Sequence, residues 1–177
     1  MENTQMVAAT AATAFSNPSA AAPSGASPVT HFDLLPATRL SEHFRLREFL
    51  ISATAIRHAI DNTPSEADVE RMTQLCRHVL EPLRRRFGAL RLTSGYRSAE
   101  LNRLVGGSPS SQHMRGEAAD ISVPCREVAE KMFGYALRHL DFDQMLLECR
   151  RKTGARWLHV SYRAGGPNRR DARRIVL

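Results

Sequence analysis

The sequence is short of cysteine, of lysine and of long apolar runs, and each shortage narrows what the protein can be. Its three cysteines, Cys76, Cys125 and Cys149, are odd in number and form no CxxC pair, which argues against a disulfide framework and a thiolate metal site. No apolar run approaches the roughly 20 residues of a membrane-spanning helix. The first 30 residues hold no Lys or Arg and no continuous apolar segment, so no signal peptide is recognised. The chain is therefore expected to be made in the cytoplasm and to have no membrane span.

Basic charge is abundant, and arginine carries almost all of it. The formal net charge is +7, the pI is about 10.1, and 23 of the 25 basic residues are Arg. Because the guanidinium group binds phosphate and carboxylate through a planar fork, the partner is expected to be acidic: nucleic acid, anionic lipid or an anionic cell-wall polymer. No helix-turn-helix, zinc-finger or aromatic RNA-binding pattern accompanies the charge, so nucleic acid is not the expected partner.

Length and composition predict one globular domain with a segment at each end. A chain of 177 residues with a hydrophobic fraction of 42% can bury a single core. Residues 1–38 have little charge and few large apolar side chains, so they are predicted to be a disordered, low-complexity leader. The domain is expected over residues 39–165. The basic segment 166–177 is expected to be a mobile tail, although Ile175 to Leu177 could dock on a sheet.

Residue periodicity predicts several helices and strands. Ser65 is a candidate N-cap for a helix over about 66–87 that Gly88 ends, and Pro82 is expected to kink it. Further helices are expected at 98–106 and 126–140, after a short apolar stretch at 42–50. Strands are expected at 90–96, 117–124, 143–149 and 156–162, the last two joined as a hairpin.

Two segments hold side chains that can bind a metal ion. They are SSQHMRGEAAD at 110–120 and RWLHVSY at 156–162, which supply His113, Asp120 and His159. Strand periodicity points His159 away from the aliphatic side of its strand, so it can share a cleft with Asp120 if the two strands are neighbours. Three nitrogen and oxygen ligands suit Zn²⁺, and a fourth position left for water makes such a site catalytic.

Five ordered segments resemble the M15 peptidases, the D-alanyl-D-alanine carboxypeptidase and phage-lysin group. The pattern SxHxxGxAxD is met by Ser111, His113, Gly116, Ala118 and Asp120, and WLHVSY matches the later WxHxS segment. LREFLISATAIRHAIDN, SGYRSAELNRLVGGS and DQMLLE match the branch with LxEFxxSxTAxRxxIDN near its start. The resemblance covers roughly residues 41–162.

The resemblance implies a small α+β fold with an antiparallel sheet flanked by helices, of the hedgehog and D-Ala-D-Ala-peptidase type. It also implies one zinc ion, held by His113, Asp120 and His159, and hydrolysis of an amide bond in peptidoglycan, the expected partner. A phage-type lysin is the leading interpretation. A host periplasmic murein carboxypeptidase or endopeptidase, and a non-catalytic zinc-binding module that recognises the wall, are the alternatives. A monomer that acts on the wall in the periplasm or outside the cell is expected.

The resemblance also assigns catalytic and substrate-binding roles. Arg97 occupies the arginine of SGYRS, which in the family grips a carboxylate or carbonyl of the substrate. Glu148 stands where this branch has an acidic residue before the second histidine, so it is the predicted general base, with Asp143 as the second candidate. The pocket is expected to include Ser111 and Gln112, which can form hydrogen bonds with substrate, and Trp157, which is expected to form a wall of the cleft.

Overall fold

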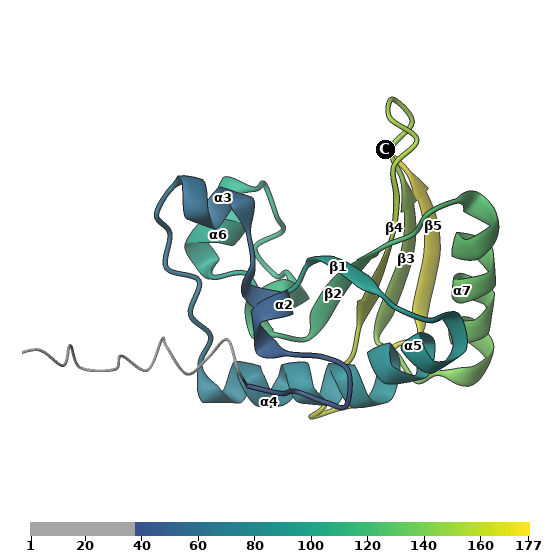
Figure 1. Cartoon of the computed structure of the whole chain (residues 1–177), viewed down its shortest axis with the longest axis horizontal. Helices are drawn as coiled ribbons and strands as arrows, with labels where there is room; N and C mark the ends of the chain where they lie inside the picture. Colours follow the sequence, from purple (N-terminus) through teal and green to yellow (C-terminus); the bar gives the residue numbers. More distant parts are fainter. Residues whose placement is uncertain (1–37) are drawn as a thin grey trace, which may run out of the picture.

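The computed structural model describes residues 38–177, so of the predicted leader, residues 1–38, all but the last residue lies outside the described part. The helices are α2 (Leu46–Leu50), α3 (Ala53–Arg57), α4 (Glu66–Leu75), the π-helix η2 (Cys76–Leu80), α5 (Glu81–Phe87), α6 (Ala99–Leu104), the 3₁₀-helix η3 (Gln112–Arg115) and α7 (Arg126–His139). The strands are β1 (Arg91–Ser94), β2 (Ala118–Ser122), β3 (Gln144–Cys149), β4 (Arg156–Ser161) and β5 (Asp171–Val176). The predicted α+β fold is confirmed, and Figure 1 shows helices on several sides of one sheet.

The helix predicted over 66–87 forms as one continuous run of α4, η2 and α5. Its start is a capping box, in which the Ser65 hydroxyl accepts from the Asp68 amide and the Asp68 carboxylate accepts from the Ser65 amide. Its end is Gly88, whose φ of 83° is accessible to glycine at little cost. Pro82 lies in the first turn of α5, directly after the π-helical turn. The wider π turn therefore coincides with the position where proline removes a backbone donor.

The sheet has the strand order β1-β2-β4-β3-β5. All neighbours are antiparallel except β3 and β5, which run parallel. On one face, alternate residues such as Ile121, Leu158 and Met145 are buried in the core, and α7 packs on this side. The opposite face carries Asp120 and His159, which are paired across β2 and β4. Because side chains alternate between faces, the buried alternate positions fix which residues line the other side.

The segment 166–177 is not a mobile tail. Residues Asp171–Val176 form β5, which pairs with β3 over its whole length. Arg174 reaches α7, where it bonds to Glu130 and lies 4.3 Å from the centre of the Phe133 ring. The sequence predicted docking only from Ile175 onward, and it placed the segment outside the domain. An edge strand tolerates this many arginines because their long side chains can cover apolar surface while the charged ends stay in water.

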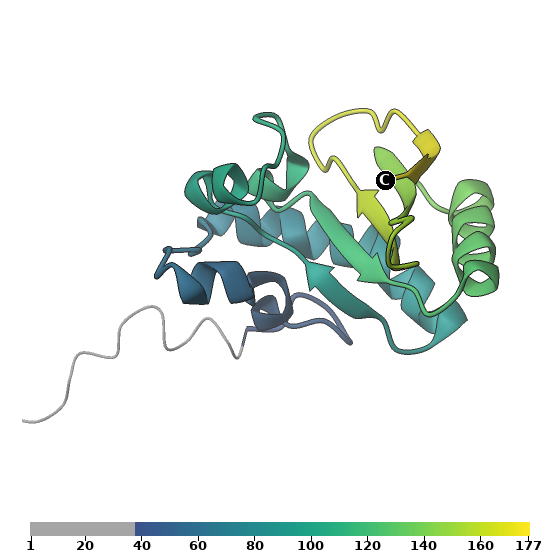
Figure 2. The ribbon, with the colours of Figure 1, turned by 90° about the horizontal axis from the view of Figure 1, so that it is seen from above.

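The core lies between the sheet, α7 and the long helix, and seen from above these elements form one body (Figure 2). Phe44, Phe49, Phe133 and Phe142 are the largest of its fully buried side chains. None of the helices in residues 38–177 combines the length and the hydrophobicity of a membrane span.

Candidate active site

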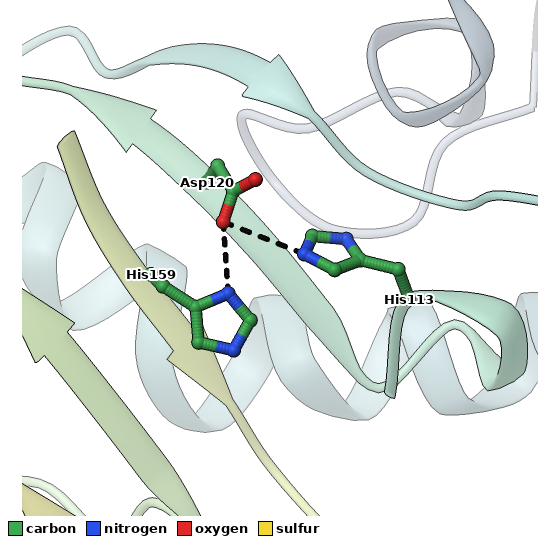
Figure 3. Close-up of side chains that lie close together, drawn as sticks. All are labelled: His113, Asp120 and His159. Atoms are coloured by element: carbon green, nitrogen blue, oxygen red, sulfur yellow. Dashed lines mark hydrogen bonds and ion pairs between the residues drawn. The ribbon is translucent and has the colours of Figure 1, made fainter. Parts of the chain in front are cut away.

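The side chains of His113, Asp120 and His159 converge at one point on the open face of the sheet (Figure 3). Asp120 on β2 and His159 on β4 are direct cross-strand partners, and His113 enters from η3. One Asp120 oxygen, Oδ1, lies 2.8 Å from His159 Nδ1 and 3.4 Å from His113 Nε2. One donor atom from each residue lies within 4.8 Å of the other two. A single small cation can therefore contact all three.

The orientation of His113 is fixed from behind by Gly95, the residue that follows β1. Its Nδ1 lies 2.6 Å from the carbonyl oxygen of Gly95, and a carbonyl can only accept, so the proton of a neutral ring resides on Nδ1. Gly95 is required here because a Cβ atom would lie 2.5 Å from the Cα of Phe49 in α2. This close approach of Gly95 to α2 places the carbonyl, and through it the imidazole.

Burial lowers the pKa of His113, and the positive charge of Arg97 lowers it further, so its neutral form is favoured despite the nearby Asp120. Burial opposes ionisation of Asp120, but its hydrogen bond with His159 helps to hold its pKa well below the ordinary range. The centre therefore combines a neutral imidazole with an anionic carboxylate, and these are the protonation states in which each group binds a metal.

The same geometry places two lone pairs face to face. With its proton on Nδ1, His113 directs the lone pair of Nε2 towards Asp120 Oδ1, an anionic acceptor 3.4 Å away. Two acceptors at this separation repel each other unless a positive charge lies between them. The donor set of two imidazoles and one carboxylate suits Zn²⁺ with a fourth position open, so these residues fit the ion that the sequence predicted.

Arg97 holds the other oxygen of Asp120. Its Nη2 donates to Asp120 Oδ2 at 3.1 Å and its Nε donates to Ser94 Oγ at 2.9 Å. No acceptor among residues 38–177 takes its three remaining N–H groups, and its side chain lines the cavity beside the centre. Arg97 thus positions a predicted metal ligand and can also bind a substrate oxygen.

A cavity of about 750 Å³ opens over the three residues, and Glu148 lines it. Glu148 on β3 is the cross-strand partner of Trp157. Leu146, which lies on the same strand, is the cross-strand partner of His159. Burial raises the pKa of the Glu148 carboxyl, and the Asp120 carboxylate raises it further, although His159 and a hydrogen bond with Trp157 act in the opposite direction. A carboxylate with a raised pKa beside a metal centre is suited to accept a proton.

The second candidate base, Asp143, is already paired with Arg169. It is fully buried, and both of its oxygens accept from Arg169, with Nη2 donating to Oδ2 at 2.6 Å and the Arg169 amide donating to Oδ1 at 3.0 Å. Burial opposes its ionisation, yet these bonds keep the pKa of Asp143 below its ordinary value. A carboxylate held in this way is a poor proton acceptor, so the geometry favours Glu148.

Replacing Asp143 with Asn should therefore cost stability rather than turnover. We expect unfolding free energy to fall by about 2 kcal/mol, because a buried charged pair loses its anion while the half-exposed Arg169 can regain water. Because the folded pKa is lowered, this contribution is full above the ordinary carboxyl pKa and is lost as the pH falls through the folded value. Denaturant melts of both proteins should converge in acid, and a peptide-hydrolysis assay should show a loss below about ten-fold.

The predicted substrate-binding residues lie at different places. Ser111 and Gln112 line the cavity, although the Gln112 amide already donates to Glu117 at 3.3 Å. Trp157 does not line it: it is the cross-strand partner of Glu148, and the Arg150 guanidinium lies 5.8 Å from its ring. Trp157, which was predicted to form a wall of the cleft, instead lies beside the predicted base Glu148.

The sequence missed three cavity-lining arginines, Arg115, Arg163 and Arg169. The last two belong to the segment between β4 and β5. Arg163 was predicted to lie at the end of the domain and Arg169 in the tail. The clustering of arginine after Tyr162 was a signal that could have pointed to them, but it contains no periodic pattern that places them beside His159.

Two imidazoles and a carboxylate on the open face of an α+β sheet, with a further carboxylate in the same cavity, define the class of metallohydrolases. The model of the Peptidase M15 family matches residues 42–161. The chain therefore belongs to the M15 peptidases, as its motifs predicted, and the match contains all three converging side chains and Glu148. No curated protein gives a significant match to the chain.

Proposed function

We propose that this protein is a zinc-dependent peptidase that hydrolyses an amide bond in the stem peptides or cross-links of peptidoglycan, in the manner of a phage-type lysin. The observation that carries the proposal is the convergence of His113, Asp120 and His159 within 4.8 Å, beside a cavity that also holds Glu148. Membership of the M15 peptidases supports the reaction class.

In this proposal, His113 Nε2, Asp120 Oδ1 and a ring nitrogen of His159 would hold the zinc ion. When bound, the ion supplies a Lewis acid for the scissile carbonyl and lowers the pKa of water. The chain supplies the rest of the chemistry. Gly95 and Arg97 hold two of the ligands in place, and a ligand held by such outer contacts binds metal more tightly than a free one.

Glu148 accepts the proton of the attacking water at a carboxylate oxygen and returns it to the leaving amine. Its position at the cavity, where burial and the nearby Asp120 carboxylate raise its pKa, supports this role. Arg97 has free N–H groups with which to hold a substrate carbonyl or carboxylate. Ser111 and Gln112 contact the peptide from the η3 side, whereas Trp157 positions Glu148.

The proposed substrate is an anionic wall peptide, cleaved in the periplasm or outside the cell. The excess of arginine and the formal charge of +7 support an acidic partner. The cavity is open and polar, with Arg97, Arg115, Arg163 and Arg169 among its lining residues. A cavity of this kind suits an extended polar peptide better than a compact apolar ligand.

The test is digestion of purified muropeptides by the zinc-loaded protein, followed by mass spectrometry. We expect new peptide products in the presence of zinc and a loss of at least about a hundred-fold in rate after chelation, because removing the ion removes its stabilisation of the transition state. Adding zinc back should restore the rate. A zinc-loaded sample that releases no product from any muropeptide would defeat the enzyme assignment, and equal rates before and after complete metal removal would defeat the metal mechanism.

A further inference from the structure

The segment between β4 and β5, residues 162–170, forms one rim of the cavity. Arg163 and Arg169 both line it. The match to the M15 family model ends at residue 161, so this rim lies just beyond the matched part of the chain.

The rim is anchored at both ends. At its start, the Tyr162 amide donates to the Glu117 carbonyl at 2.9 Å, and the Tyr162 ring stacks on His78 with centroids 4.5 Å apart. At its end, Arg170 donates from its two terminal nitrogens to the carbonyls of Leu140 and Leu137, each at 2.6 Å. These contacts fix where the intervening side chains emerge.

Asn168 closes the rim on itself and on the body of the domain. Its side-chain oxygen accepts from the Arg163 amide at 2.8 Å, and its side-chain nitrogen donates to Asp141 at 2.9 Å. The Arg163 side chain therefore extends from a backbone position that a hydrogen bond holds in place. A side chain on such a base loses less entropy on binding than one on an unanchored loop.

Arg163 differs from the other cavity arginines in its partners. Arg97 is paired with Asp120, Arg115 with Glu117 and Arg169 with Asp143. No carboxylate among residues 38–177 lies within ion-pair distance of Arg163, whose side chain is exposed at the cavity. Within residues 38–177, its guanidinium is thus the cavity cation that has no ion pair of its own, since Asp143, whose pKa its charge lowers, is held by Arg169.

We propose that Arg163 binds a carboxylate of the substrate and makes the enzyme selective for peptides that are not amidated at that carboxylate. The inference rests on the proposed function and adds a specificity residue to it. A guanidinium presents a planar fork that matches a carboxylate through two parallel hydrogen bonds, whereas a neutral amide satisfies only part of that pattern. Arg115 and Arg169 are paired with the chain's own carboxylates and do not compete for this role, whereas Arg97 keeps free N–H groups for a second substrate oxygen.

The experiment compares Arg163→Gln, Arg163→Lys and wild type on a matched set of muropeptides. One substrate carries all its free carboxylates, and each of the others has a single carboxylate converted to amide. We expect Arg163→Gln to lower kcat/KM on the fully acidic peptide about ten-fold, because a charge-assisted hydrogen bond at a partly exposed site is worth about that factor. On one of the amidated peptides, Arg163→Gln and wild type should have equal kcat/KM values. The carboxylate that is amidated in that peptide is the one that Arg163 binds.

Arg57→Gln on α3 is the matched control, since it removes the same charge from an exposed residue that does not line the cavity. We expect it to leave every kcat/KM unchanged and Arg163→Lys to retain part of the selectivity. Equal losses for Arg163→Gln on every peptide, or no loss on any, would overturn the carboxylate role while leaving the peptidase proposal intact. Failure of wild type to cleave any member of the set would instead overturn the proposed function, and this inference with it.

Discussion

Replacing His159 with Ala is expected to abolish zinc binding and to lower the peptidase rate at least about a thousand-fold. The variant leaves two of three protein ligands, and Asp120 loses the imidazole whose Nδ1 lies 2.8 Å from its Oδ1. A metal ion contributes several kcal/mol to transition-state stabilisation, and each 1.36 kcal/mol is a factor of about ten in rate. Metal content measured by mass spectrometry, together with hydrolysis of a muropeptide, checks both parts.

A matched histidine variant separates metal loss from general damage. His58 ends α3, is exposed and does not line the cavity, so His58→Ala should keep full zinc content and full rate. Circular dichroism should show the same fold for both variants, because the His159 side chain lies on the open face and not in the apolar core. A His159→Ala protein that retained one zinc per chain would show that His159 is not a ligand.

The converging side chains could be selected from sequence because their strands have a simple period. Alternation along β2 and β4 gives Asp120 and His159 a defined face, and the motif around them marks both as candidates. Their direct pairing across β2 and β4 could not be read locally, because register depends on how two distant segments align. The Gly95 carbonyl behind His113 was missed for the same reason, since a backbone acceptor has no sequence signature.

The C-terminal strand shows where local patterns fail. Asp171–Val176 contains two adjacent arginines and follows a Gly-Gly-Pro sequence, which resembles a solvated tail. Its strand conformation comes from pairing with β3 and from Arg174 reaching Phe133 and Glu130 on α7. Strand propensity depends strongly on such neighbours, and those neighbours lie 27 residues earlier in β3 and 44 residues earlier at Glu130 of α7.

The choice between two candidate bases also needed tertiary contacts. Glu148 and Asp143 lie on the same stretch of sequence, and both line the cavity. What separates them is Arg169, which occupies Asp143 with three side-chain contacts and one backbone contact. The sequence contains no pattern that pairs an aspartate with an arginine 26 residues away, so Asp143 remained an alternative until the fold was known.

Replacing Glu148 with Gln is expected to lower kcat by about 10²- to 10⁴-fold while zinc content stays at the wild-type level. The loss is that of a positioned general base, and glutamine keeps the size and shape of the side chain beside its cross-strand partner Trp157. Metal affinity should be preserved because Glu148 is not one of the three converging side chains.

Steady-state kinetics on a muropeptide, with metal analysis of the same sample, distinguishes this result from the loss of a ligand. Asp143→Asn is the internal comparison, because it removes a second carboxylate that lines the cavity, directly before β3. This variant should lose more stability than rate. If Glu148→Gln hydrolysed the peptide as fast as wild type with zinc bound, another group would have to accept the proton. A fall in zinc content that matched the fall in rate would instead place Glu148 among the ligands, because a base acts on water and leaves metal affinity intact.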